Sequence, residues 1–257
     1  MNEAELLFSE IFGCDRASLY LKKNIPLDKD KLSKVSSVLK RRFSGEPLQY
    51  ILGKTEFMGL EFRVNPSVLI PRPETEILVE KAAEMATSLK IMDIGTGSGC
   101  IAISLAKLLK DADIIATDIS DNALEVAKEN ARRHGVKINF ILADLFNAVD
   151  CVMHPVDLII SNPPYVASGE IATLQPEISY EPRIALDGGA DGLDFYRRII
   201  NGAVDYLKKD GLLILEIGFD QSRAIADIFQ RSGKFKIIEI VKDYSNIERV
   251  MVAVKNG

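Results

Sequence analysis

The chain has 257 residues, 47% hydrophobic and 27% charged, with a formal net charge of −5. This composition is typical of a folded globular protein and excludes disordered and fibrous classes, while the acidic balance argues against broad binding to nucleic-acid phosphates. Three cysteines without CxxC spacing and two isolated histidines predict neither disulfides nor a metal site. Without a signal-peptide pattern or an apolar run of membrane-spanning length, a cytoplasmic location is expected.

The spacing of apolar residues changes at Pro73, and the 72 residues before it have two patterns of their own. From Glu3 to Phe43 the apolar positions recur at helical spacing, which predicts a small helical domain over residues 1–50. Its basic residues at 34 and 40–42 are interpreted as the solvated face of a helix. Residues 51–69 alternate as in strands, and Gly59 stands where a tight turn would fall. A β-hairpin linker is therefore expected over residues 51–72.

From Pro73 onward short apolar runs alternate with amphipathic segments, as in a doubly wound α/β domain spanning residues 73–257. Strands are predicted at 91–94, 114–117, 138–142, 158–161, 212–217, 236–241 and 249–254, and helices at 76–89, 101–109, 122–134, 193–207 and 221–232. The segment between the last two strands is too short for a crossover, so these strands should form an antiparallel hairpin. A seven-stranded sheet ending in such a hairpin is the arrangement of Rossmann-like class I methyltransferases.

A glycine-rich loop follows the first strand of this domain. Glycines there let the backbone turn sharply and approach a ligand closely. Cys100 stands where the dinucleotide fingerprint has its third glycine, which disfavours a nicotinamide cofactor. The candidate cofactor residues of the loop are Gly95, Thr96, Gly97, Ser98 and Gly99.

Acidic residues end the next two strands. Asp118 could accept hydrogen bonds from both hydroxyls of a ribose, and Asp144 could accept one from an adenine amino group. Leu145 and Phe146 could supply an apolar wall for the ring. Each feature alone is a weak signal, and an Asp at a strand end is more often a turn former, but three such features at the carboxyl ends of successive strands indicate a nucleoside cofactor.

The fourth strand ends in Asn162, Pro163, Pro164 and Tyr165. Two prolines restrict the backbone and hold the Asn162 side chain in one geometry. The Asn162 side-chain oxygen and the Pro163 carbonyl could accept both N–H bonds of a planar amino group, which favours its pyramidal transition state in attack on a sulfonium methyl group. With Tyr165 stacked on that group, Asn162, Pro163 and Tyr165 are candidate catalytic residues, and all four are candidate substrate-binding residues.

Through these motifs and several further segments, the chain resembles the HemK-like family, the release factor glutamine N5-methyltransferases. The matching segments are residues 46–53 (EPLQYILG), 57–62, 68–76 (VLIPRPETE), 181–186 (EPRIAL), 188–189 and 191–193. The resemblance implies S-adenosylmethionine as cofactor, contacted at Gly95 to Gly99, at Asp118, at Asn162 and after Asp144. It also implies that the substrate is the glutamine of a Gly-Gly-Gln loop in class 1 release factors, with the helical domain docking this partner.

Two other functions are weighed. A methyltransferase for adenine or guanine amino groups in DNA or rRNA should carry a basic surface and a target-recognition insert, and the acidic sequence shows neither. A cofactor-binding protein without activity would make the Asn-Pro-Pro-Tyr segment incidental. Arg72, Glu74 and Arg183 have two interpretations, an ion-pair network or direct substrate contact. A monomer is expected.

Overall fold

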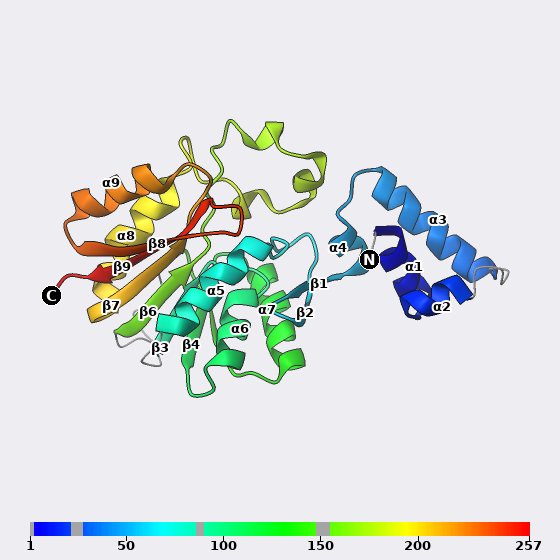
Figure 1. The fold of residues 1–257 in the computed structure, drawn as a ribbon, viewed down its shortest axis with the longest axis horizontal. Coiled ribbons are helices and arrows are strands. Elements are labelled where there is room, and N and C mark those ends of the chain that lie inside the picture. The colour runs from blue at the N-terminus through cyan, green and yellow to red at the C-terminus, as the bar shows by residue number, and fades with distance from the viewer. Residues whose placement is uncertain (1–2, 22–27, 86–89, 148–154) are drawn as a thin grey trace.

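A small helical region, a two-stranded hairpin and an α/β domain follow one another along the chain (Figure 1). The structure, a computed structural model, describes residues 3–21, 28–85, 90–147 and 155–257. Cys151 and His154 lie outside these ranges. None of the helices within them is long and apolar enough to cross a membrane.

The helical region contains α1 (Glu3–Phe12), α2 (Arg16–Leu21), α3 (Lys29–Phe43) and α4 (Leu48–Leu52). Helix α3 begins where the Asp28 carboxylate accepts a hydrogen bond from the Lys31 amide at 2.8 Å. Its basic last turn is only partly solvated, because Arg41 pairs with Glu46 and Arg42 pairs with Glu177, both at 2.5 Å. These ion pairs attach the end of α3 to the segments that contain Glu46 and Glu177.

The hairpin joins β1 (Lys54–Phe57) to β2 (Leu60–Arg63). Met58 and Gly59 both have positive φ, as in a type I′ turn, so the turn predicted at Gly59 is confirmed. The strands are shorter than expected. Residues 51–52 belong to α4, and residues 64–69 form no strand because Pro66 cannot donate to a ladder.

In the described parts of the α/β domain, seven strands form one sheet in the order β5-β4-β3-β6-β7-β9-β8. Neighbours are parallel except that β9 runs antiparallel to both β7 and β8, which confirms the predicted terminal hairpin. The strands are β3 (Lys90–Ile94), β4 (Asp113–Asp118), β5 (Asn139–Leu142), β6 (Val156–Ser161), β7 (Leu207–Glu216), β8 (Phe235–Lys242) and β9 (Glu248–Lys255). Strand β7 starts five residues before its predicted start at 212, since Leu207 already pairs with Val156.

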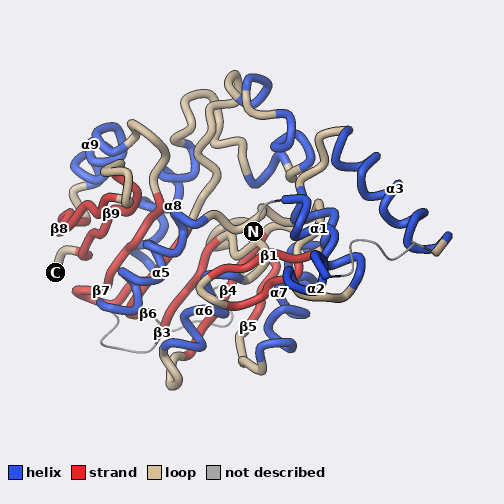
Figure 2. Tube along the Cα trace, turned by 45° about the vertical axis from the view of Figure 1, so that its right-hand side comes forward, coloured by secondary structure: helices blue, strands red, loops and turns tan. Residues whose placement is uncertain are grey.

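Helices cover both faces of this sheet (Figures 1 and 2). Side chains alternate along each strand, so Ile91 packs with α5 (Pro73–Met85), α6 (Cys100–Leu108) and α7 (Asp121–His134). Met92 packs on the other face with α8 (Asp194–Tyr206) and α9 (Ser222–Ser232). Phe57 and Phe62 of the hairpin join the first of these two cores, which attaches the linker to the domain.

A long segment, residues 162–193, connects β6 to α8 and is drawn at the top of Figure 1. It contains three short 3₁₀ helices, Ile171–Thr173, Pro176–Tyr180 and Arg183–Ala185. The Tyr180 hydroxyl donates to the Ser44 carbonyl at 2.8 Å. Together with the ion pair between Arg42 and Glu177, this contact brings the helical region beside the carboxyl edge of the sheet.

Candidate active site

The glycine loop lies between β3 and α6, at the point where the strand order reverses and a ligand is expected in a doubly wound sheet. Gly95 and Gly97 have φ angles of 73° and 56°. A Cβ atom at either position would meet no atom of the described residues within 4 Å, and both glycines line a cavity, which we call the first cavity. At these two residues the bare backbone faces the space that a ligand would fill.

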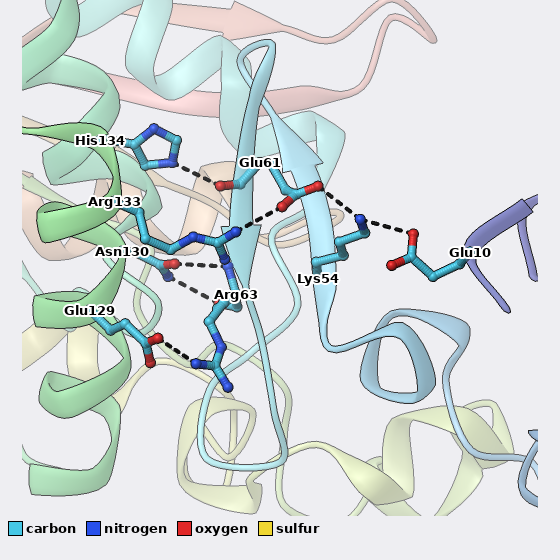
Figure 3. A network of polar contacts seen from close by, with 8 residues as sticks. All are labelled: Glu10, Lys54, Glu61, Arg63, Glu129, Asn130, Arg133 and His134. Carbon is cyan, nitrogen blue, oxygen red and sulfur yellow. Dashed lines mark hydrogen bonds and ion pairs between the residues drawn. The ribbon is translucent and has the colours of Figure 1, made fainter. Parts of the chain in front are cut away.

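The other loop residues shape this backbone without lining the cavity. The Thr96 hydroxyl donates to the buried Asp93 carboxylate at 2.6 Å, and the Ser98 carbonyl accepts from the Asn130 side-chain amide at 2.9 Å. The Asn130 side chain also bonds the backbone N–H and carbonyl of Arg63 at 2.8 and 3.0 Å (Figure 3). Gly99 packs against α7. Asn130 therefore ties the hairpin, α7 and the glycine loop together.

Asp118 lies at the end of β4 and lines the first cavity. Its carboxylate accepts from the Gly97 amide at 2.8 Å and from the Ser120 amide at 2.9 Å. Burial raises the pKa of Asp118, and these backbone hydrogen bonds oppose the rise. Since each carboxylate oxygen has two acceptor sites, Asp118 can hold the loop and still accept hydrogen bonds from a ligand.

Asp144 and Leu145 also line the first cavity, whereas Phe146 does not. The Phe146 ring is buried in the core and stacks on Tyr206 with ring centres 4.8 Å apart. The chain turns at Leu145, where φ is 55°, and the two neighbouring side chains diverge. The expectation that Phe146 joins Leu145 in an apolar wall is thus corrected. Sequence reasoning missed Ile119 and Phe195, which do line the cavity.

Asn162 and Pro163 lie at the junction of two cavities. Both residues, with Pro164, line the first cavity beside the glycine loop. Asn162 and Pro163 also line a second cavity, together with Tyr165 and several apolar side chains: Leu69, Val166, Leu174, Ile178, Ala185 and Leu186. Burial raises the pKa of Tyr165 to about 12, so this phenol stays neutral.

Hydrogen bonds hold the end of this turn, at Tyr165 and Val166. The Gln221 side-chain amide donates to the Tyr165 carbonyl at 2.9 Å. Val166 then exchanges backbone hydrogen bonds with Leu186 and Gly188, at 2.9 and 2.8 Å. The prolines restrict the turn from within, and these contacts fix its position against α9 and the 162–193 segment.

The two arginines with open interpretations both form ion pairs. Arg72 contacts the buried Glu181 carboxylate at 2.6 Å, and Arg183 contacts Asp187 at 3.1 Å. Burial raises the pKa of Glu181, and Arg72 opposes that rise. Because Arg72 also lines the second cavity, it can serve both the ion pair and a substrate.

Comparison with known proteins identifies relatives over nearly the whole chain. The release factor glutamine methyltransferase of Geobacter sulfurreducens is 44% identical over 251 residues, which cover 97% of this chain and 87% of that protein. The release factor glutamine methyltransferase of Thermodesulfovibrio yellowstonii is 41% identical over 263 residues, 100% of this chain and 93% of that protein. This chain belongs to the release factor glutamine methyltransferase family. The resemblance drawn from its motifs is confirmed.

Two domain families agree with that assignment. The PrmC N-terminal domain matches residues 1–53, and the methyltransferase small domain matches residues 73–179. Among solved structures, a ribosomal protein L11 methylase from Lactobacillus delbrueckii is 24% identical, with a TM-score of 0.56 over 76% of this chain and 86% of that one. A methyltransferase from Pyrococcus furiosus is 17% identical, with a TM-score of 0.57 over 90% and 100%. These structures confirm the predicted class I methyltransferase fold.

Two residues that sequence reasoning missed, Thr75 and Glu216, lie next to Asn162 and line neither cavity. The Thr75 hydroxyl donates to the Glu216 carboxylate at 2.7 Å and accepts from the Asn162 side-chain amide at 3.1 Å. A signal for Glu216 was present, since it is a carboxylate at the carboxyl end of an apolar strand, as Asp118 is. As for metals, no group of three or more potential ligands occurs within the described ranges.

Proposed function

We propose that this protein transfers a methyl group from S-adenosylmethionine to the side-chain amide nitrogen, N5, of the glutamine in the Gly-Gly-Gln motif of class 1 peptide chain release factors. The observation that carries this proposal is the junction of two cavities at Asn162 and Pro163. The first cavity suits a nucleoside, and the second cavity suits a side chain with an apolar stem and a planar amide at its end. A nitrogen bound at the junction lies next to whatever the first cavity presents.

The first cavity fits S-adenosylmethionine on three counts. Gly95 and Gly97 leave open the volume that side chains would fill, Asp118 keeps acceptor sites for ribose hydroxyls, and Leu145 gives an apolar surface beside Asp144. When bound, S-adenosylmethionine supplies an electrophilic methyl group on a sulfonium sulfur. The chain's own residues then have to bind and orient the nitrogen that accepts it.

An amide nitrogen is a poor nucleophile because its lone pair is delocalised. The Asn162 Oδ1 and the Pro163 carbonyl accept its two N–H bonds, and this pair of acceptors favours the pyramidal, positively charged nitrogen over the planar amide. The neutral Tyr165 ring packs on the planar group and orients it. A strong base is not required, because the methylated nitrogen is acidic and releases its proton to water.

The partner is proposed from the surroundings of the second cavity. A polar cleft lies between the helical region and the 162–193 segment, and it shares Arg72 and Ile178 with the second cavity. This cleft offers a protein loop a route from the docking region, residues 1–50, to Asn162. The net charge of −5 disfavours the alternative of a nucleic-acid substrate. Translation factors place the reaction in the cytoplasm, and a monomer suffices because one chain lines both cavities.

The test uses labelled S-adenosylmethionine with a purified class 1 release factor, its Gly-Gly-Gln glutamine-to-alanine variant, or duplex DNA. Label should enter the intact release factor only. Asn162→Ala should still bind the cofactor but transfer no label, whereas Asn201→Ala, on the exposed side of α8, should match the wild type. Label in DNA, or full activity of Asn162→Ala, would overturn the proposal.

A further inference from the structure

Three polar side chains from distant parts of the chain form a hydrogen-bonded row behind the catalytic turn. Asn162 follows β6, Thr75 lies in the first turn of α5, and Glu216 ends β7. The Asn162 Nδ2 donates to the Thr75 Oγ1 at 3.1 Å, and that hydroxyl donates to the Glu216 Oε2 at 2.7 Å. Thr75 and Glu216 are each 2% exposed and line neither cavity, so neither touches a substrate.

The direction of this row follows from counting protons. An ionised carboxylate only accepts hydrogen bonds, so the single hydroxyl proton of Thr75 must go to Glu216. The Thr75 oxygen can then only accept from Asn162, which must turn its Nδ2 toward Thr75. The Asn162 Oδ1 is thereby turned away from Thr75. An Asn amide is otherwise nearly symmetric in shape, and sterics alone would not choose between its two ends.

We propose that Thr75 and Glu216 are positioning residues that orient the Asn162 amide, so that its oxygen and not its nitrogen faces the nitrogen to be methylated. This inference rests on the proposed function for the identity of the reacting group. With the amide reversed, Asn162 would present N–H groups to the N–H groups of the substrate, and the interaction favouring the transition state would be lost.

The row has a built-in dependence on pH. Burial raises the pKa of Glu216 to about 7, against the opposing effects of Thr75, Arg249 and Asn162, and Glu74 adds to the rise. A protonated Glu216 can donate to Thr75, and the Thr75 hydroxyl can then either accept from the Asn162 Nδ2 or donate to the Asn162 Oδ1. The orientation is therefore specified above pH 7 and lost below it. Within the described ranges, the titratable or charged groups that interact with the Glu216 carboxylate are Glu74, Cys100, Tyr165, Tyr196 and Arg249.

Substitutions at Thr75 separate orientation from packing. Thr75→Val keeps the shape but breaks the row, and kcat should fall roughly 10- to 100-fold while the Kd for S-adenosylmethionine and the KM for the release factor stay within about threefold. Thr75→Ser restores the hydroxyl and should recover most of kcat. The matched control, Thr117→Val, removes an equally buried hydroxyl that has no hydrogen-bond partner among the described residues, and it should keep the wild-type kcat. An unchanged kcat in Thr75→Val, or an equal loss in Thr117→Val, overturns the proposal.

The pH profile gives a second test that does not need the Thr75 variants to fold. The wild-type kcat should fall as the pH drops below 7 and level off near the kcat of Glu216→Gln. Glu216→Gln, whose amide can present either end to Thr75, should have a lower kcat and no acidic limb. A wild-type kcat that is flat between about pH 5.5 and 8.5, or an acidic limb retained in Glu216→Gln, contradicts the proposal.

A third measurement is independent of the substrate. The ¹⁵N side-chain amide resonances of Asn162, assigned by their loss in Asn162→Ala, should titrate near pH 7 in the wild type and not in Glu216→Gln. If this titration occurs while release factor is not methylated, the proposed function fails and the inference about Asn162 stands. If methylation occurs and the resonances do not change with pH, only the inference fails.

Discussion

Gly192 gives the most direct test of how the turn at Asn162–Tyr165 is held in place. Its φ angle is 73°, and a Cβ atom there would lie 2.4 Å from the Tyr165 carbonyl oxygen. Alanine in this backbone conformation costs about 1 kcal/mol, and overpacking against a backbone atom adds about 1–3 kcal/mol. The Gly192→Ala protein should therefore lose about 2–4 kcal/mol of unfolding free energy.

Activity should fall as well. The contact must open by about 1 Å to reach the ordinary range of 3.4–4 Å, which displaces the Tyr165 carbonyl and with it the turn. A misplacement of about 1 Å in a catalytic group can cost up to 100-fold in rate, so kcat should drop about 10- to 100-fold.

Gly135 provides the matched control. It ends α7 with a φ of 65°, but a Cβ atom there would meet nothing within 4 Å in the part of the chain that the structure describes. Gly135→Ala should lose only about 1 kcal/mol in urea unfolding and keep the wild-type kcat. If Gly192→Ala matches Gly135→Ala in both unfolding free energy and kcat, the reasoning about close approach to Tyr165 is refuted.

Substitutions at three further residues give additional tests. Asp118→Asn removes a charged acceptor, so calorimetry should show a Kd for S-adenosylmethionine about 10- to 100-fold higher, and an unchanged Kd would refute the ribose contact. Burial raises the pKa of Asp93 from 3.8 to about 7, so its contribution to stability is full below pH 4 and lost as the pH rises to 7. Asp93→Asn should therefore gain unfolding free energy relative to the wild type at pH 8 and not at pH 4, and an equal gain at both would contradict this sign. If the Tyr165 ring packs on the substrate amide as proposed, Tyr165→Phe should keep kcat within about threefold and Tyr165→Ala should not. A low kcat in Tyr165→Phe would instead assign the role to the hydroxyl.

The strands were predictable because a parallel sheet covered on both faces needs continuous apolar runs. The run at residues 158–161 became β6, and the Asn-Pro-Pro-Tyr turn follows its end. Element ends were less predictable, since they depend on pairing partners. Leu207 lies in a strand because Val156 pairs with it, and residues 64–69 leave the hairpin because Pro66 blocks a ladder.

The direction of individual side chains was the second feature that could not be predicted from the sequence. Leu145 and Phe146 are equally apolar in the sequence, yet one lines the first cavity and the other stacks on Tyr206. The positive φ at Leu145 separates them, and no local pattern announced it.

By itself, the sequence determined the class of sheet, the glycine loop, the acidic strand ends and the Asn-Pro-Pro-Tyr turn, because each depends on local backbone chemistry or on burial pattern. The tertiary structure alone decided which residues stand behind that turn. Thr75 and Glu216 are 141 positions apart, and they meet beside Asn162 only because α5 packs against β7 and β9. Contacts between such distant segments arise from how the elements pack, which local spacing does not encode.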